Sequence, residues 1–173
     1  MYYSEIKNCD IANGEGVRVT LFVSGCTHRC KGCFNEMTWD FNFGKPFDEI
    51  AENAVIDMLK PDYISGLTLL GGEPMEAVNQ RALLPFIKRV KSIYPNKTVW
   101  CYTGYTLERD LLGSSRARCD VTDELLSYID VIVDGEFILA QKNISLRFRG
   151  SENQRIFRRI GEVWQPAPDL MTR

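Results

Sequence analysis

Three of the six cysteines lie within the segment 26–33, which reads CTHRCKGC. Their spacing, C-x3-C-x2-C, allows three thiolates from one loop to converge on a single compact metal centre. A [4Fe-4S] cluster that only transfers electrons takes four cysteines, so three ligands leave one iron free to bind another molecule. A metal with an open position can carry out chemistry. Cys26, Cys30 and Cys33 are therefore predicted to hold a catalytic cluster.

A structural zinc site is the alternative interpretation of this loop, with His28 or a distant cysteine as the fourth ligand. Structural zinc motifs usually pair two short cysteine knuckles, but Cys9, Cys101 and Cys119 form no second knuckle. His28 is the only histidine and is interpreted as a loop residue beside the cluster. Cys101 is expected to be a small buried residue of a strand, and Cys9 and Cys119 are expected to be inert free thiols.

A second segment that suits ligand binding is Gly71-Gly72-Glu73-Pro74, which directly follows a short apolar run. Glycine has no Cβ, so the backbone there can approach a ligand closely and adopt unusual φ angles. Taken alone, such a segment is more typical of an ordinary turn. Thr103, Gly104 and Asp134 also follow apolar runs. They are further candidates for contacting a ligand, although polar residues at strand ends often only cap turns.

The elements that position these residues alternate between strands and helices. Runs rich in β-branched and aromatic residues predict strands over residues 18–24, 67–70, 98–103 and 129–133. Apolar residues at helical spacing predict helices over 48–60, with Asp48 as N-cap, over about 83–94, where Pro85 starts or kinks the helix, and over 122–128. Right-handed crossovers place the C-terminal ends of parallel strands on one edge of the sheet. The cysteine loop and the three other candidate segments are therefore predicted to meet at that edge.

The composition is ordinary for a single globular α/β domain: 173 residues, of which 45% are hydrophobic and 25% charged. We expect residues 1–155 to form the domain and residues 156–173 to form a polar C-terminal tail, in which Pro166 and Pro168 argue against a long final helix. The formal net charge of −2 provides no field that would attract nucleic acid or an anionic membrane. Neither is expected as a partner.

No stretch approaches the roughly 18 apolar residues of a membrane span. The N-terminus carries charged residues where a signal peptide would need an apolar core. A cytoplasmic location is therefore expected, and its reducing environment favours metal ligation over disulfides for these cysteines.

The sequence resembles the radical S-adenosylmethionine (SAM) superfamily in two motifs. The C-x3-C-x2-C loop follows the first predicted strand and is itself followed by the aromatic Phe34, and Gly71-Gly72-Glu73-Pro74 looks like the superfamily's GGEP motif. Within the superfamily, the chain is most similar to the family of anaerobic ribonucleoside-triphosphate reductase-activating proteins. The segments that carry this likeness are 13–18, 21–26, 32–35, 38–39, 103–105, 133–135 and 149–155. The chain departs from the family pattern at Glu15, Phe34 and Cys101, none of which is a predicted cluster ligand.

The resemblance implies a partial, open (βα) barrel of the radical SAM type with a parallel sheet, and an oxidoreductase that activates a glycyl-radical enzyme. The implied cofactors are a [4Fe-4S] cluster on Cys26, Cys30 and Cys33 and SAM bound to the unique iron, with no catalytic residue beyond them. The implied SAM-binding residues are Gly32, Cys33, Phe34, Gly71, Gly72, Glu73, Pro74, Thr103 and Asp134. The implied partners are the large subunit of the anaerobic ribonucleoside-triphosphate reductase, whose backbone glycine becomes a stable radical, and a low-potential electron donor.

Three other functions remain open at this point. The chain could activate a different glycyl-radical enzyme, act on a small molecule as another radical SAM enzyme, or bind metal without catalysis. The basic residues Arg147, Arg149 and Arg155 are interpreted either as a solvated surface with ordinary ion pairs or as a site that docks the reductase.

Overall fold

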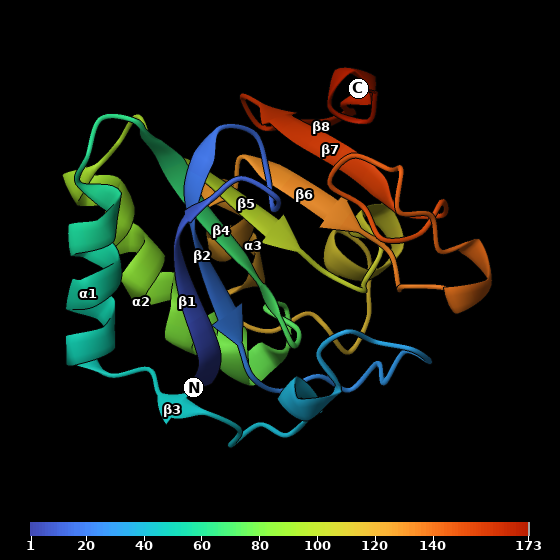
Figure 1. The fold of residues 1–173 in the computed structure, drawn as a ribbon, viewed down its shortest axis with the longest axis horizontal. Helices are drawn as coiled ribbons and strands as arrows, with labels where there is room; N and C mark the ends of the chain where they lie inside the picture. Colours follow the sequence, from blue (N-terminus) through green and yellow to red (C-terminus); the bar gives the residue numbers. More distant parts are fainter. Residues whose placement is uncertain (173) are drawn as a thin grey trace.

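The computed structural model describes residues 1–172, which form an α/β fold around one eight-stranded mixed sheet (Figure 1). The strand order is β3-β1-β2-β4-β5-β6-β7-β8. The four central strands are parallel: β2 (Val17–Val23), β4 (Ile64–Gly71), β5 (Thr98–Tyr102) and β6 (Val131–Asp134). These are the four strands predicted from the apolar runs, and because they are parallel their C-terminal ends share one edge of the sheet.

Antiparallel strands extend the sheet on both sides. They are β1 (Tyr2–Asp10) and β3 (Lys45–Pro46) beyond β2, and β7 (Arg155–Ile160) and β8 (Val163–Pro166) beyond β6. Within the described residues β3 and β8 are the edge strands, so the sheet is open and does not close into a barrel. The segment expected to be a polar tail thus contributes strands over its described part, because Ile156 and Phe157 are buried beside β6.

Within residues 1–172, the connections between strands carry three α-helices, and shorter helical turns lie in these connections and after β8. The α-helices are α1 (Glu49–Leu59), α2 (Ala77–Ile93) and α3 (Thr122–Tyr128). The shorter elements are the 3-10 helices η1 (Glu36–Trp39), η3 (Leu139–Gln141) and η4 (Pro168–Leu170), and the π-helical turn η2 (Leu107–Leu111). Among residues 1–172, none of the helices has the length and apolar character needed to cross a membrane.

Two of the helices test the sequence prediction in detail. Asp48 caps α1 as predicted, since its carboxylate accepts a 3.0 Å hydrogen bond from the backbone N–H of Ala51. In contrast, α2 begins at Ala77, well before the predicted start, and Pro85 lies inside it. Proline leaves the carbonyl four residues earlier without its helical partner, but Arg81 and Pro85 are both exposed, so solvent can bind that carbonyl.

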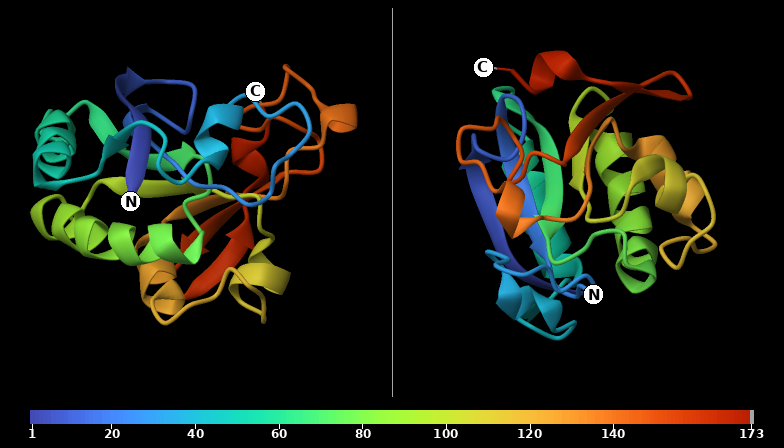
Figure 2. Two further views of the ribbon diagram at one scale, coloured as in Figure 1. Left: turned by 90° about the horizontal axis from the view of Figure 1, so that it is seen from below. Right: turned by 90° about the vertical axis from the view of Figure 1, so that its right-hand side faces the viewer.

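Two hydrophobic clusters of buried residues pack against the sheet. Figure 2 shows the arrangement of the helices and the sheet in two further views. The larger cluster packs the sheet against the three α-helices. Its strand residues include a row at matched register across five strands: Leu21, Leu69, Cys101, Ile132 and Phe157. The smaller cluster lies on the opposite face, where Trp100, Val133 and Ile156 pack against Leu170 of η4. Both faces of β5 and β6 are therefore covered, which fixes their ends rigidly beside the cysteine loop.

Candidate metal centre

The cysteine loop leaves the C-terminal end of β2 and returns to the sheet edge through η1. Its base is anchored by backbone hydrogen bonds from Gly25 N–H to the Thr38 carbonyl (2.7 Å) and from Cys26 N–H to the Trp39 carbonyl (3.3 Å). Gly25 has φ +98, and a Cβ there would lie 2.3 Å from the Phe41 ring. Glycine at this position therefore permits both the backbone turn and the close packing of the loop base.

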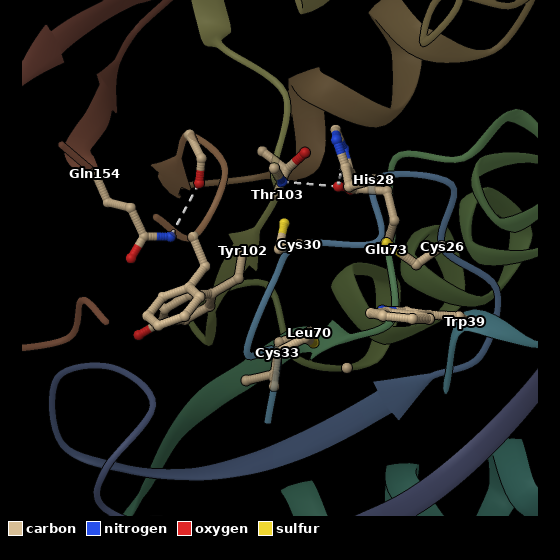
Figure 3. Close-up of a pocket in the computed structure, with 15 residues that line it drawn as sticks. Cys26, His28, Cys30, Cys33, Trp39, Leu70, Glu73, Tyr102, Thr103 and Gln154 are labelled. Carbon is tan, nitrogen blue, oxygen red and sulfur yellow. Dashed lines mark hydrogen bonds and ion pairs between the residues drawn. The ribbon is translucent and has the colours of Figure 1, made fainter. Parts of the chain in front are cut away.

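Cys26, Cys30 and Cys33 all line one pocket of about 160 Å³. Further lining residues come from the ends of the next three parallel strands and the chain that follows them: residues 70–73 at the end of β4, 102–104 at the end of β5, and Gly135 and Phe137 after β6. Figure 3 shows the three cysteines together with Trp39 and Tyr102 on opposite sides of them. The structure thus brings the cysteine loop and the three other predicted segments to one edge of the sheet.

The three cysteines are free thiols in a partly buried environment. Cys26 is 9% exposed, and Cys30 and Cys33 are half-buried. Burial, together with the nearby charge of Glu73, raises the pKa of the Cys26 thiol to about 12. Burial also raises the pKa of Cys30. Metal ligands must be thiolates, so cluster assembly at this site must release protons, and a cationic iron centre would stabilise the deprotonated form.

The thiols fit a cluster with three protein ligands. Among the described residues, the remaining cysteines lie elsewhere: Cys101 is fully buried in β5, Cys9 is exposed on β1, and Cys119 lies beside Gln80. No three His, Cys, Asp or Glu side chains between residues 1 and 172 are placed to chelate one metal ion. A [4Fe-4S] cluster does not require the three thiols to meet at one ion, because each cysteine binds a different iron of the cluster.

Glu73 connects three loops at the back of the pocket. Its carboxylate is 1% exposed and accepts hydrogen bonds from the backbone N–H groups of Met75 (2.8 Å) and Gly104 (2.7 Å). The Oε2 atom also lies 3.0 Å from His28 Nε2. This single side chain therefore links the loop after β4, the loop after β5 and the cysteine loop.

His28 lies between two carboxylates instead of facing the thiols. Its Nε2 faces Glu73, its Nδ1 lies 2.7 Å from Glu136 Oε1, and its ring packs 4.4 Å from that of Tyr105. Burial alone would lower the pKa of His28, but the two carboxylates have the larger combined effect and raise it to about 9. With both ring nitrogens facing carboxylate oxygens, His28 is not placed to be a fourth metal ligand. This geometry disfavours the zinc interpretation.

Gly72 packs closely against the base of the cysteine loop. Its N–H donates a 2.7 Å hydrogen bond to the Val23 carbonyl. A Cβ added to Gly72 would lie 2.7 Å from the Gly25 carbonyl oxygen and 2.9 Å from that of Thr38. The glycine therefore lets three backbone segments pack together beneath the pocket, in addition to exposing backbone to a ligand.

The remaining predicted site residues are divided by the structure. Gly71, Glu73 and Thr103 line the pocket together with Cys33 and Gly72. Gly32, Phe34, Pro74 and Asp134 do not line it. Phe34 is 75% exposed, and Asp134 is fully buried, where its carboxylate accepts the Leu107 N–H (2.8 Å) and binds Arg155.

Sequence reasoning did not identify Trp39, Tyr102 and Gln154 as pocket residues. Trp39 Nε1 and Tyr102 Oη are buried and make no hydrogen bond within residues 1–172. Buried polar atoms are normally satisfied, so a polar ligand would fit between these walls. The only signal for Trp39 in the sequence is that it belongs to a segment that carries the family likeness. Tyr102 gives none, because it reads as one more strand residue.

Comparisons with known proteins agree with a cluster site. The chain matches the family described as a 4Fe-4S single cluster domain over residues 12–157, a span that contains every pocket-lining residue. It is 48% identical over 160 residues to the anaerobic ribonucleoside-triphosphate reductase-activating protein of Haemophilus influenzae, covering 91% of this chain and 98% of that protein. Proteins of the same name from Vibrio cholerae and Enterobacteria phage T4 are 45% and 38% identical, over 91% and 95% of this chain and 98% and 99% of their own lengths.

Proposed function

The chain belongs to the family of anaerobic ribonucleoside-triphosphate reductase-activating proteins, and we propose that it is the radical SAM enzyme that activates the large subunit of such a reductase. When bound, the cofactors supply the chemistry: one electron from a reduced [4Fe-4S] cluster splits SAM into methionine and a 5′-deoxyadenosyl radical, which takes a hydrogen atom from a backbone glycine of the reductase. The products on the two partners are 5′-deoxyadenosine and a glycyl radical. The electron comes from a low-potential donor in the cytoplasm.

In this proposal Cys26, Cys30 and Cys33 hold the cluster as thiolates. The backbone hydrogen bonds at Gly25 and Cys26 anchor the base of the loop that carries the thiols. Three cysteines leave one iron open for SAM. The four parallel strands with their helices on one face would then correspond to the open, partial (βα) barrel of the radical SAM type.

The predicted SAM-binding residues that line the pocket would bind SAM. Cys33, Gly71, Gly72 and Thr103 present backbone or small side chains to the pocket, and Glu73 supplies a buried negative charge that suits the ammonium group of SAM. Four other predicted residues do not line the pocket and would instead help to shape the loops around it: Gly32, Phe34, Pro74 and Asp134.

The observation that carries the proposal is the placement of three thiols, without a fourth cysteine, in the pocket where the four parallel strands end. The test is to mix the anaerobically reconstituted protein, a strong reductant, SAM and the large reductase subunit. An electron paramagnetic resonance doublet from a glycine radical should appear, together with methionine and 5′-deoxyadenosine. Alanine in place of the target glycine of the partner should remove the doublet while SAM cleavage persists.

Two outcomes would redirect the assignment. Cleavage of SAM without any radical on the matched wild-type reductase would leave a radical SAM enzyme with another substrate. A protein that binds iron or zinc but never cleaves SAM would be a metal-binding module.

A further inference from the structure

Four apolar side chains lie together where the pocket meets the molecular surface, and we call them the apolar rim: Phe34, Phe137, Ile138 and Leu139. Phe137 lines the pocket itself. The other three are exposed, Phe34 by 75%, Ile138 by 39% and Leu139 by 43%. Exposed apolar groups that gather at one place on a protein mark interaction sites more often than isolated ones do.

Direct contacts join the two segments of the rim, although they are about a hundred residues apart in the sequence. The rings of Phe34 and Phe137 have centroids 6.1 Å apart. A Cβ built on Gly32 of the cysteine loop would lie 3.0 Å from Leu139 Cδ1, so this leucine packs on the loop backbone. Lys142 places its ammonium 4.7 Å from the Phe34 ring centroid, which holds that ring in place from outside.

The segment that carries the rim is held by its own hydrogen bonds. The backbone N–H of Ile138 donates to Ser151 Oγ (3.2 Å), and that of Glu152 donates to the Gln141 carbonyl (2.9 Å). Asn153 Nδ2 donates to the Glu136 carbonyl (2.8 Å). The exposed apolar side chains therefore sit on a pre-organised support, which lowers the entropy cost of binding a partner.

We propose that the apolar rim is the docking surface for the segment of the reductase polypeptide that carries the reacting glycine. This inference rests on the proposed function. A glycine in a folded partner can reach the pocket only if the residues flanking it cross the pocket mouth. The rim runs from the pocket lining, at Phe137, to the open surface, at Phe34, so it offers those flanking residues an apolar surface beside the pocket.

The basic group near the C-terminus is less suited to this role. Arg155 binds Asp134 and Glu108, and Arg149 Nη1 donates to the Gln154 carbonyl at 3.1 Å. Arg147 lies over the Phe148 ring, 4.6 Å from its centroid. These arginines are engaged in bracing the chain itself, whereas the exposed parts of Phe34, Ile138 and Leu139 are free to bind apolar side chains of the partner.

The test is the double variant Ile138→Ser/Leu139→Ser, with the single variant Ile138→Ser in case the contact between Leu139 and the cysteine loop disturbs the cluster. Anaerobically reconstituted proteins are assayed first for iron content and for 5′-deoxyadenosine release without partner. They are then assayed for the Kd of the large subunit and the rate of glycyl-radical formation. We expect partner-free SAM cleavage to stay within about twofold of wild type, and the Kd to rise about tenfold.

A control variant removes two apolar side chains that are more exposed than Ile138 and Leu139 and do not line the pocket. Ile160→Ser/Val163→Ser changes the β7–β8 hairpin, where these residues are 55% and 58% exposed. The control should bind the reductase with wild-type affinity. An unchanged Kd for the reductase in both rim variants would overturn the proposal that the rim docks the reductase. If the rim variants also self-associated less at that unchanged Kd, the occupant of the rim would be a second copy of this chain. Absence of SAM cleavage in the wild type would instead refute the proposed function.

Discussion

The substitution Glu73→Gln probes how the pocket wall is held together. Each carboxylate oxygen of Glu73 accepts a hydrogen bond from a different backbone N–H, that of Met75 at 2.8 Å and that of Gly104 at 2.7 Å. Glutamine keeps one oxygen and replaces the other with an NH2 group, which is a donor. In either orientation of the amide, one buried N–H must face another donor and remains unsatisfied.

The magnitude follows from these contacts. One buried N–H without an acceptor costs about 1–3 kcal/mol, and the lost charge next to His28, 3.0 Å away, adds to that. Glu73→Gln should therefore lower the free energy of unfolding by about 2–3 kcal/mol. Glu73→Ala removes both acceptors and leaves the histidine unpaired on this side, so a loss of about 3–5 kcal/mol is expected.

The assay is guanidinium chloride unfolding of the metal-free protein, followed by circular dichroism without oxygen, so that cofactor binding does not contribute. Glu36→Gln is the control, because Glu36 is an exposed glutamate of the nearby η1 and its change should stay within about 0.5 kcal/mol. If Glu73→Gln were as stable as this control, the two hydrogen bonds would not contribute as the geometry requires. The reasoning about the pocket wall would then be wrong.

Three further predictions concern the cluster, the second motif and acid stability. Cys30→Ala should abolish the four-iron cluster after reconstitution, whereas Cys101→Ala should retain it, as iron and sulfide analysis would reveal; iron loss only in Cys101→Ala would invalidate the ligand assignment. Gly72→Ala should reduce iron content as well as SAM affinity, because the new Cβ would lie 2.7 Å from the Gly25 carbonyl oxygen at the base of the cysteine loop. A full iron complement in this variant would contradict that expectation. Asp110→Asn should cost about 1–2 kcal/mol at neutral pH. Hydrogen bonds from Arg109 and the Thr106 N–H hold the pKa of Asp110 well below its usual range. The stability that the Asp110 carboxylate contributes is therefore fully present above about pH 4 and is lost as the pH falls through the lowered pKa. In urea melts at several pH values, a stability difference between variant and wild type that grew on acidification would contradict this expectation.

The central strands could be predicted because each is a compact apolar run between turn residues. The outer strands could not be predicted in this way. In β7, the adjacent residues Ile156 and Phe157 are buried in different clusters on opposite faces, so the strand shows no alternation, and three arginines make it look polar. In β1, two register shifts and exposed charges such as Glu5 and Lys7 obscure the period of two.

The candidate site was predictable only where chemistry depends on residues close together in sequence. Cysteine spacing and the Gly-Gly-Glu-Pro segment are local patterns, and the topology of parallel strands was enough to bring them together. The roles of Trp39, Tyr102 and Gln154 depend on how loops from β2, β5 and β7 fold over the pocket, which no local pattern records. Likewise, the contact between the rings of Phe34 and Phe137 joins residues about a hundred positions apart, which no local pattern records.

Glu73 and Asp134 both follow predicted strands, but their carboxylates bind different parts of the structure. Asp134 is tied to the Leu107 N–H and to Arg155, which also binds Glu108, so its charge joins the end of β6 to η2 and β7 behind the pocket. Glu73 reaches across the pocket wall to the loop after β5 and to His28. A residue at a strand end can turn to either side of the sheet edge, and its hydrogen-bond partners decide which. Asp134 is paired with Arg155, whereas the charge of Glu73 contributes to raising the pKa of Cys26 and the charge of Glu136 contributes to raising that of Cys30.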